Sequence, residues 1–310
     1  LALNKEMSKK QARIRTYKVV PFSRRSGILE WCSDTMPVGL YLVGNKGVKG
    51  AHERYRPNDW RPDKAIREIM STDSSNIETK VAKFTEVCKN LKPVFHQFFY
   101  EHFKSPGRIF ERRFAYTVSL AVSSMIGYIL GIGDRHVQNI LIDLKTAEVI
   151  HIDFGIAFEA GKCLPHPELI PFRLSRDFIA PLGVSGVDGI FRKTCEKTME
   201  ILRENEKTIA TILEVLLYDP MYAWSIGAKH ARRRQLECDE VDDSGSNDEK
   251  EKHDLMASRA LQRVQAKLKG FADDSSVRYP SIDGQVQYLI QAATNPVNLS
   301  KLFRGWQAYL

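Results

Sequence analysis

Polar side chains that suit phosphate and metal chemistry gather in residues 127–159, where a long apolar run ends. Asp134 and His136 follow a glycine-rich break, Asn139 comes next, and Asp153 follows a second apolar run. Carboxylate and amide oxygens are ligands that a hard cation prefers, and no thiolate lies in the cluster to favour zinc. The residue types therefore predict a site for Mg²⁺ or Mn²⁺.

The apolar runs between these residues predict an antiparallel β-hairpin that positions them. Its expected parts are two strands and a loop, at residues 140–143, 149–152 and 144–148. The expected register sets Ile140 opposite Ile152, which places Asn139 opposite Asp153 one step further on. Directly opposed residues have Cα atoms about 4.5–5.5 Å apart, so the amide and the carboxylate could hold one cation.

A cation with so few protein ligands usually accompanies a nucleotide, because it bridges the phosphates. In phosphoryl-transfer sites one Asp orients the attacking hydroxyl, and an Asn and a second Asp hold the metals. Asp134 fits the first role, Asn139 with Asp153 fits the second, and His136 could donate to a phosphate or move a proton. Taken singly, each could instead be a helix cap, a turn residue, a hairpin end or a core histidine. The shared register favours phosphoryl transfer.

The bulk composition is that of a globular protein with an excess of basic residues. The chain has 310 residues, of which 43% are hydrophobic and 27% charged, and its formal net charge is +8. That excess suits an anionic ligand, but it also occurs where only solubility is needed. The five cysteines form no close pairs and no metal-ligand spacing, so a reducing compartment is favoured over a disulfide framework or a zinc site.

Residues 114–133 carry no charge over about 20 positions, the length that spans a bilayer. The run contains serines, a threonine and glycines and leads directly into the polar cluster, so we predict a buried core helix over residues 111–132. The charged start of the chain has no apolar signal segment and no initiator Met, which suggests a piece of a longer polypeptide.

Other patterns predict the elements around this core. Residues 13–31 favour two short strands on either side of a Pro/Ser/Gly turn. Apolar residues at helical spacing predict helices in residues 76–103, broken near Pro93, and in residues 186–219. The aromatic stripe of residues 95–103 is more typical of a core than of a ligand site.

The last part of the chain contains a break in composition. Residues 232–254 have almost no apolar content and a dense acidic run, so we predict a disordered insertion. A basic amphipathic helix follows. Trp306 and Tyr309 stand at the C-terminal end, where chains usually fray, so we expect this tail to dock against the main body.

Two motifs resemble those of the phosphatidylinositol 3-kinase-related protein kinases, in which Asp-Arg-His inverts the His-Arg-Asp of ordinary protein kinases. They are GDRHVQN at residues 133–139 and HIDFG at residues 151–155. Further segments resemble the ataxia-telangiectasia mutated (ATM) branch of that family and its fungal telomere-maintenance counterpart, namely TYKVVPFSRRSGILEW, RYRPNDW, PFRLSRD, GVDGIFRKTCEKTME and LLYDPMYAW. The final NLSKLFRGWQAYL resembles their short C-terminal FATC module.

The resemblance covers nearly the whole chain and implies an α+β, protein-kinase-like fold of the phosphoinositide-kinase type, mainly its helical C-lobe. The implied organisation is the end of the kinase N-lobe with the hinge (1–31), the C-lobe with catalytic and activation loops (32–231), the acidic insertion (232–254), a regulatory helix (255–279) and the FATC-like module (280–310).

The resemblance also assigns roles to individual residues. It makes Asp134 the base that orients the hydroxyl and His136 a stabiliser of the transition state, with Asn139 and Asp153 as ligands of the Mg²⁺ that accompanies ATP. The implied ATP-binding residues are Glu30, Trp31 and Cys32 in the hinge, with the Trp31 ring on the adenine, and Tyr17, Leu141 and Ile152 around the adenine pocket.

Two features depart from the family pattern. Phe154 stands where a Leu is expected in the closest relatives, which is a change of apolar type. No glycine-rich phosphate loop and no strand lysine precede Tyr17, so residue 1 is expected to fall inside the small lobe. The chain by itself is therefore expected to be nearly inactive.

Two other functions compete with a protein kinase. A phosphoinositide lipid kinase shares the Asp-Arg-His motif, but it needs a Lys/Arg cluster in the activation loop. Between Asp153 and Pro171 this chain has only Lys162, beside Glu159 and Glu168. A catalytically dead, DNA-binding scaffold is opposed by the complete set of metal ligands and by the scattered Lys and Arg residues.

The function implied by the resemblance is a serine/threonine protein kinase that phosphorylates Ser or Thr followed by Gln. Its expected setting is DNA-damage signalling and telomere maintenance in the nucleus. The implied partners are protein substrates, a large helical region upstream in the same polypeptide, a second copy in a homodimer and a DNA-break sensor complex, with no membrane.

Overall fold

The computed structural model describes residues 12–23, 26–72, 76–217, 247–271 and 277–310. The strands are β1 (Val19–Ser23), β2 (Ser26–Leu29), β3 (Thr35–Pro37), β4 (Gly44–Asn45), β5 (Val48–Lys49), β6 (Ile140–Asp143) and β7 (Val149–His151). The helices are α2 (Val38–Val43), α3 (Ala51–Tyr55), α4 (Pro62–Met70), α5 (Ile77–Asn90), α6 (Gln97–His102), α7 (Pro106–Leu130), α8 (Arg176–Ile179), α9 (Ile190–Glu204), α10 (Glu206–Leu217), α12 (Asn247–Leu268), α13 (Ile282–Thr294) and α14 (Pro296–Ser300). Short 3₁₀ turns are η1 (Ala160–Cys163), η2 (Ala180–Leu182), η3 (Gly186–Asp188) and η4 (Arg304–Trp306).

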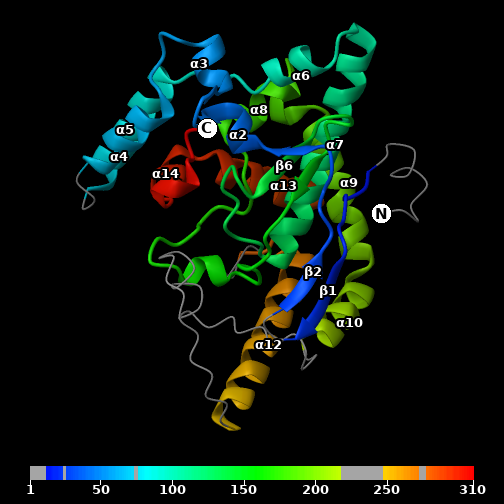
Figure 1. Cartoon of the computed structure of the whole chain (residues 1–310). Coiled ribbons are helices and arrows are strands. Elements are labelled where there is room, and N and C mark those ends of the chain that lie inside the picture. The colour runs from blue at the N-terminus through cyan, green and yellow to red at the C-terminus, as the bar shows by residue number, and fades with distance from the viewer. Residues whose placement is uncertain (1–11, 24–25, 73–75, 218–246, 272–276) are drawn as a thin grey trace.

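The long helix α7 forms the centre of the fold, with α9 packed along it and α6, α12 and β7 against its other sides (Figure 1). It begins at a Ser105 cap and Pro106, and it ends at Gly131, which adopts a left-handed φ of 60°. Among the described helices it is the one long and apolar enough to cross a membrane, yet 72% of its most apolar window is buried inside the fold. The buried helix predicted at residues 111–132 is confirmed.

Aromatic side chains pack beside α7 and form much of the core. The buried rings include those of Tyr41, Phe95, Phe98, Phe99, Phe103, Tyr116 and Phe178. Several meet edge to face, as Tyr41 and Phe98 do with ring centroids 5.4 Å apart. The helical stripe predicted at residues 76–103 is therefore core, and it is broken between α5 and α6 as Pro93 indicated.

The predicted strands at residues 13–31 are present as the antiparallel pair β1–β2, and β3 continues the chain beyond them. Strand β3 pairs with β6, and β6 pairs with β7, so the segment that leaves the first hairpin joins the sheet of the polar cluster. Helix α7 supports this sheet from behind, because the Val149 N–H donates to the Ser119 hydroxyl at 2.9 Å.

The β6–β7 hairpin forms as predicted, but its register differs by one residue. Ile140 pairs with His151, and the Ile152 N–H donates to the Asn139 carbonyl at 3.1 Å. Asn139 is therefore opposite Ile152, and the predicted pairing of Asn139 with Asp153 is wrong.

The turn between β6 and β7 explains the shift. The Asp143 carboxylate accepts the N–H groups of Lys145 and Thr146 at 2.8 and 2.7 Å, and Ala147 adopts a left-handed φ of 60°. The Asp143 N–H then reaches the Glu148 carbonyl at 3.0 Å. Glu148 thus belongs to the paired ladder instead of the loop, and every pair beyond it moves by one residue.

The C-terminal tail docks on the main body as expected. Trp306 is 3% exposed and Tyr309 is 1% exposed. The buried guanidinium of Arg173 donates to the Trp306 carbonyl at 2.8 Å and stacks over the Trp306 ring at 4.2 Å. The tail is therefore held by the last residue of the activation loop, which the resemblance places at residues 153–173.

The predicted acidic insertion lies outside the described residues as far as residue 246. From Asn247 onward the chain is helical, because α12 begins there and continues to Leu268. The bounds predicted for the insertion (232–254) and for the regulatory helix (255–279) stay a prediction.

Candidate active site

The polar cluster lies on the loop that connects α7 to β6. Gly131 ends the helix, and Gly133 places its backbone so close to the activation loop that a Cβ there would come within 2.9 Å of Ile156. Asp134 follows with a left-handed φ of 56°, an uncommon conformation for a residue other than glycine. The chain therefore turns sharply at the residue predicted to orient the substrate hydroxyl.

Asp134 and Asn139 are brought together as predicted. The Asn139 amide donates to the Asp134 carbonyl at 2.9 Å and to the Asp134 carboxylate at 3.2 Å. Asn139 is 8% exposed, whereas Asp134 is only partly buried. The buried amide thus fixes both the backbone and the side chain of an accessible carboxylate.

His136 lies on the other side of Asp134. Its Nε2 atom is 3.8 Å from the Asp134 carboxylate, and its Nδ1 atom accepts the Gln138 N–H at 3.2 Å. Burial lowers the pKa of His136 below its ordinary value, although the Asp134 carboxylate opposes that effect. The ring is therefore neutral near pH 7, and its Nε2–H is the hydrogen-bond donor of the site.

Asp153 reaches the site by a different route from the predicted one. Strand β7 ends at His151, and Asp153 adopts a left-handed φ of 55°, so the chain turns instead of continuing the ladder. Arg135 is 3% exposed and its guanidinium donates to the carbonyls of Ile152, at 2.7 Å, and of Asp153. This guanidinium holds the catalytic loop and the start of the activation loop together.

The observed register places three predicted residues on one face of the sheet. Leu141 is opposite Ile150, and Asn139 is opposite Ile152 two residues along the same strands. Opposed residues share a face, and residues two apart along a strand share it as well. Leu141, Ile152 and Asn139 therefore face the same side, which fits a pocket lined by the first two beside the amide.

The predicted hinge residues link β2 to β3. The Glu30 N–H donates to the Lys18 carbonyl at 2.8 Å, which closes the β1–β2 pair, and the Cys32 carbonyl accepts the Thr35 hydroxyl at 2.6 Å. The Trp31 side chain is 85% exposed in this chain. The predicted stacking of the Trp31 ring on adenine stays a prediction.

Tyr17 lies between the hinge and Asp153. Its ring is parallel to that of Phe154, with centroids 6.3 Å apart and an interplanar angle of 7°. Burial, then Cys32 and the charge of Asp153 raise the pKa of the Tyr17 hydroxyl, whereas Arg135 and a hydrogen bond with the Asp153 backbone lower it. Phe154, the departure from the family pattern, thus packs against a residue predicted for the adenine pocket.

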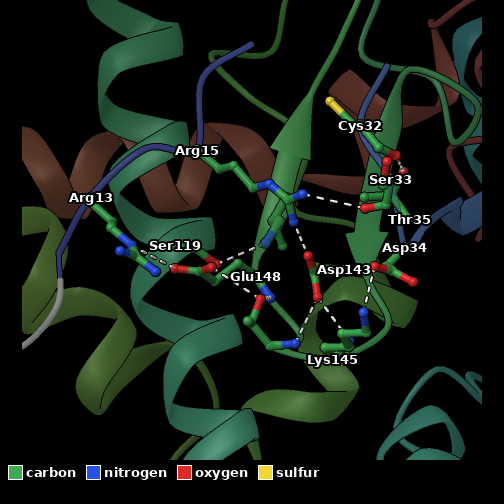
Figure 2. A network of polar contacts seen from close by, with 12 residues as sticks. Arg13, Arg15, Cys32, Ser33, Asp34, Thr35, Ser119, Asp143, Lys145 and Glu148 are labelled. Atoms are coloured by element: carbon green, nitrogen blue, oxygen red, sulfur yellow. Dashed lines mark hydrogen bonds and ion pairs between the residues drawn. The ribbon is translucent and has the colours of Figure 1, made fainter. Parts of the chain in front are cut away.

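Ionic contacts connect the segment before β1 to the β6–β7 turn, as Figure 2 shows. Arg13 lies 3.2 Å from the Glu148 carboxylate, and Arg15 pairs with the Asp143 carboxylate while also donating to the Ser33 carbonyl at 3.3 Å. Both acceptors belong to the turn that sets the hairpin register. The network therefore ties both ends of the first hairpin to the sheet that carries Asn139.

The residues present fit a hard divalent cation that takes most of its ligands from phosphates and water. Because Asp134 occupies the amide nitrogen of Asn139, the amide oxygen remains as the ligand type that Mg²⁺ prefers. Asp153 is exposed and adds a carboxylate, one oxygen of which accepts the Gly155 N–H at 3.1 Å. Among the described residues, no three His, Cys, Asp or Glu side chains form a cluster that could hold a metal alone.

Sequence reasoning missed three charged residues that build the site. Arg135 stands inside the Asp-Arg-His motif, so the sequence did mark its position. The motif did not predict that its guanidinium is buried and donates to backbone carbonyls. Glu168 accepts the Asp134 N–H at 2.7 Å, and Lys267 of α12 lies 2.5 Å from Glu159 of the activation loop. These two contacts join residues far apart in the chain, and no local sequence pattern predicts them.

Comparisons with known proteins agree with this geometry. The family model described as "Phosphatidylinositol 3- and 4-kinase" matches residues 2–226, and the FATC domain model matches residues 280–310. The chain is 47% identical over 323 residues to "Serine-protein kinase ATM" of Sus scrofa and 50% identical over 305 residues to "Serine/threonine-protein kinase ATM" of Drosophila melanogaster. The matches cover 100% and 98% of this chain but 10% of each relative, so the chain spans about a tenth of their length.

A solved structure, "Complete CtTel1 dimer with C2 symmetry", superposes with a TM-score of 0.85 at 38% identity and covers 100% of this chain and 10% of that one. The predicted fold class, a phosphoinositide-kinase type of protein-kinase-like fold with a helical C-terminal module, is thereby confirmed. The chain belongs to the phosphatidylinositol 3- and 4-kinase family and carries a FATC domain at residues 280–310.

Proposed function

We propose that this chain is the catalytic part of a serine/threonine protein kinase that transfers the γ-phosphate of ATP to protein substrates. The observation that supports it most directly is the contact of Asn139 with both the backbone and the carboxylate of Asp134. That pairing gives an accessible carboxylate one orientation next to an amide suited to a metal. The relatives named as serine or serine/threonine protein kinases support the same reaction class.

Different side chains of the site perform different parts of the proposed reaction. Asp134 accepts a hydrogen bond from the substrate hydroxyl and aims its oxygen at the phosphorus. The neutral His136 donates from Nε2 to a phosphate oxygen, where negative charge accumulates during transfer. Asn139 holds Asp134 in place during the reaction, and Arg135 keeps Asp153 at the edge of the same site.

The proposed cofactors are ATP and Mg²⁺, or Mn²⁺ in its place. The metal would be held by the Asn139 amide oxygen and the Asp153 carboxylate, and when bound it neutralises charge on the phosphates. The adenine would lie against Leu141 and Ile152, with Tyr17 on one side. The hinge residues Glu30, Trp31 and Cys32 would complete this pocket through their backbone groups and the Trp31 ring.

A protein substrate is favoured over a phosphoinositide. Lys162, the one Lys or Arg between Asp153 and Pro171, lies 3.1 Å from the Glu159 carboxylate. A cation paired in this way is poorly placed to hold inositol phosphates, which carry several negative charges. We propose Ser or Thr followed by Gln as the phosphorylated sequence, on the resemblance of the activation loop to the ATM branch.

The wider setting is also part of the proposal. The complete protein would act in the nucleus, in DNA-damage signalling and telomere maintenance, with an upstream helical region and a DNA-break sensor complex as partners and no membrane. A homodimer is supported by the twofold dimer named for the Tel1 structure. A catalytically dead DNA-binding scaffold would instead leave the Asp134–Asn139 contact without a purpose.

The test uses the complete protein with Mg–ATP and three substrates: a Ser-Gln peptide, a Ser-Ala peptide and phosphatidylinositol vesicles. We expect Asp134→Ala to lower turnover of the Ser-Gln peptide by about 10²–10⁴-fold with nucleotide binding nearly unchanged, because this carboxylate acts on the hydroxyl. Asp153→Ala should instead weaken Mg–nucleotide binding. Asp188→Ala, which removes a carboxylate that is 75% exposed on the surface, is the control.

Two outcomes would overturn the proposal. Wild-type turnover of the Ser-Gln peptide by both site variants would show that these residues do not have the assigned roles. Phosphorylation of the vesicles in preference to either peptide would show a lipid kinase instead.

A further inference from the structure

The activation loop touches the catalytic loop through one carboxylate. Glu168 follows the η1 turn, and its Oε2 atom accepts the backbone N–H of Asp134 at 2.7 Å. Its own N–H donates to the Gly161 carbonyl at 3.1 Å, which ties it to the activation loop. Glu168 therefore lies at the point where the two loops meet, 34 positions along the chain from Asp134.

The backbone at Asp134 needs such a support. With a φ of 56°, Asp134 is held in a region that costs a non-glycine residue free energy and persists only where its surroundings fix it. In this conformation its N–H points toward the activation loop, where Glu168 accepts it. A side-chain oxygen of Glu168 accepts this N–H at 2.7 Å, so Glu168 is placed to hold the backbone in this conformation.

The space around Glu168 is shaped for this contact. A Cβ at Gly133 would lie 2.6 Å from the Glu168 carboxylate, and one at Gly161 would lie 3.0 Å from it. Any larger residue at Gly133 would therefore push the carboxylate off the Asp134 N–H. Two glycines, one from each loop, leave room for a single oxygen between them.

The local charges agree with a close approach of Glu168 to the catalytic base. Burial raises the pKa of Glu168 to about 7, the hydrogen bond from Asp134 lowers it, and the Asp134 charge raises it again. Arg135 also acts on this carboxylate from the catalytic loop and lowers its pKa. An acidic side chain is kept in this poorly solvated place, although none of the described residues forms an ion pair with it.

We propose that Glu168 is a positioning residue that holds the backbone of Asp134 in the conformation in which its side chain meets Asn139 and the substrate hydroxyl. This inference rests on the proposed function. Because Glu168 belongs to the activation loop, any movement of that loop away from its present place releases Asp134. The arrangement makes the geometry of the catalytic base depend on the activation loop through one hydrogen bond.

The test compares Glu168→Ala with Glu168→Gln in the complete protein. Alanine removes the acceptor, whereas the glutamine carbonyl can still accept the Asp134 N–H. We expect Glu168→Ala to lower kcat for a Ser-Gln peptide by about 10²-fold, the loss typical of a displacement near 1 Å at a reacting group. KM for Mg–ATP should stay unchanged, because the hydrogen bonds of Glu168 go to Asp134 and Gly161.

The conservative variant and a matched control separate positioning from a general loss of structure. Glu168→Gln should keep most of the wild-type kcat. Asp59→Ala also removes a carboxylate that accepts a backbone N–H, that of Lys92 at 3.0 Å, but at a surface far from the chemistry, and it should leave kcat unchanged. Hydrogen exchange of the peptide that contains Asp134 should become faster in Glu168→Ala, with β6 and β7 unaffected.

Three results would overturn the inference: an unchanged kcat in Glu168→Ala, a loss in KM for Mg–ATP alone, or a Glu168→Gln variant as impaired as the alanine variant. If the wild type phosphorylates no peptide, the proposed function fails instead, and exchange at Asp134 alone then decides whether Glu168 holds it. An Asp134 amide that exchanges at the same rate in wild type and Glu168→Ala would end the positioning role whatever the activity.

Discussion

Replacing Lys267 by Met should loosen the contact between α12 and the activation loop. The Lys267 ammonium lies 2.5 Å from a Glu159 oxygen, and each side chain is 5% exposed. It also donates to the Tyr128 carbonyl at 2.7 Å and lies 4.7 Å above the centre of the Tyr128 ring. Methionine has a similar length and stays apolar, so the change removes the charge and the donor with little loss of packing.

The size of the effect depends on which cations remain near Glu159 in the variant. Removing one partner of a buried ion pair costs about 3–5 kcal/mol, because the other charge is left in a poorly solvated place. Burial raises the pKa of Glu159, but Lys267 and then Lys162 lower it by more in total. In the variant Lys162, at 3.1 Å, and Arg263, at 3.9 Å, still face the carboxylate. We therefore expect the lower end, about 3 kcal/mol, or about 10²-fold in a local opening constant.

Hydrogen exchange is the suitable assay, because it reports local opening in a large protein that does not unfold in two states. Amides of residues 257–270 and of the activation loop should lose about 10²-fold in protection. Lys269→Met is the control: its side chain is 54% exposed and its ammonium is 3.4 Å from Glu206, so it should change protection little.

The double variant decides whether the pair itself is responsible. Glu159→Gln removes the charge that Lys267→Met leaves unpaired, so the two together should cost clearly less than the sum of the single changes. Strict additivity, or a Lys267→Met variant as well protected as Lys269→Met, would refute the reasoning.

Two further predictions concern other carboxylates. Asp177→Ala should destabilise the fold by about 3 kcal/mol, because the buried N–H groups of Val94 and Phe95 lose their acceptor. These groups donate to the Asp177 carboxylate at 2.7 and 3.0 Å. The measurement is hydrogen exchange at residues 94–99. The pKa of Glu168 is raised from 4.5 to about 7, so its stabilising contribution is fully present below pH 4.5 and is lost as the pH rises through about 7. Hydrogen exchange of the Asp134 amide, corrected for its intrinsic rate, should therefore become faster as the pH rises from 4.5 to about 7. This pH dependence should be absent in Glu168→Gln. A wild-type protein without this pH dependence would contradict the prediction.

The elements that carry the site were predictable because their signals are local. The buried strand β6 and the helix α7 are apolar runs with clear ends, the first at a polar turn and the second at Gly131. The docking of Trp306 and Tyr309 followed from aromatic residues at an otherwise frayed position. In each case the sequence pattern and the physical cause of the structure lie in the same short stretch of the chain.

The contacts that hold the site in place were not predictable in this way. Glu168 stands in a Pro-rich, polar segment, and only the folded chain shows that its carboxylate meets the Asp134 N–H. Lys267 lies on a basic helix on which Arg259 and Arg263 are exposed, so its burial against Glu159 gives no periodic signal. Such pairs depend on which surfaces meet, and a single sequence does not contain that information.

The hairpin register shows why the predicted site residues can lie close together although the predicted pairing is wrong. A strand alternates its faces, so one register cannot place both Leu141 with Ile152 and Asn139 with Asp153 on the same side of a regular ladder. The predicted register satisfied the second pair, and the observed one satisfies the first. Asp153 escapes the conflict because its left-handed φ of 55° ends the alternation, and Arg135 then fixes it through its backbone carbonyl. Leu141 and Ile152 can line the pocket while Asp153 reaches the same site, because the regular strand ends before Asp153.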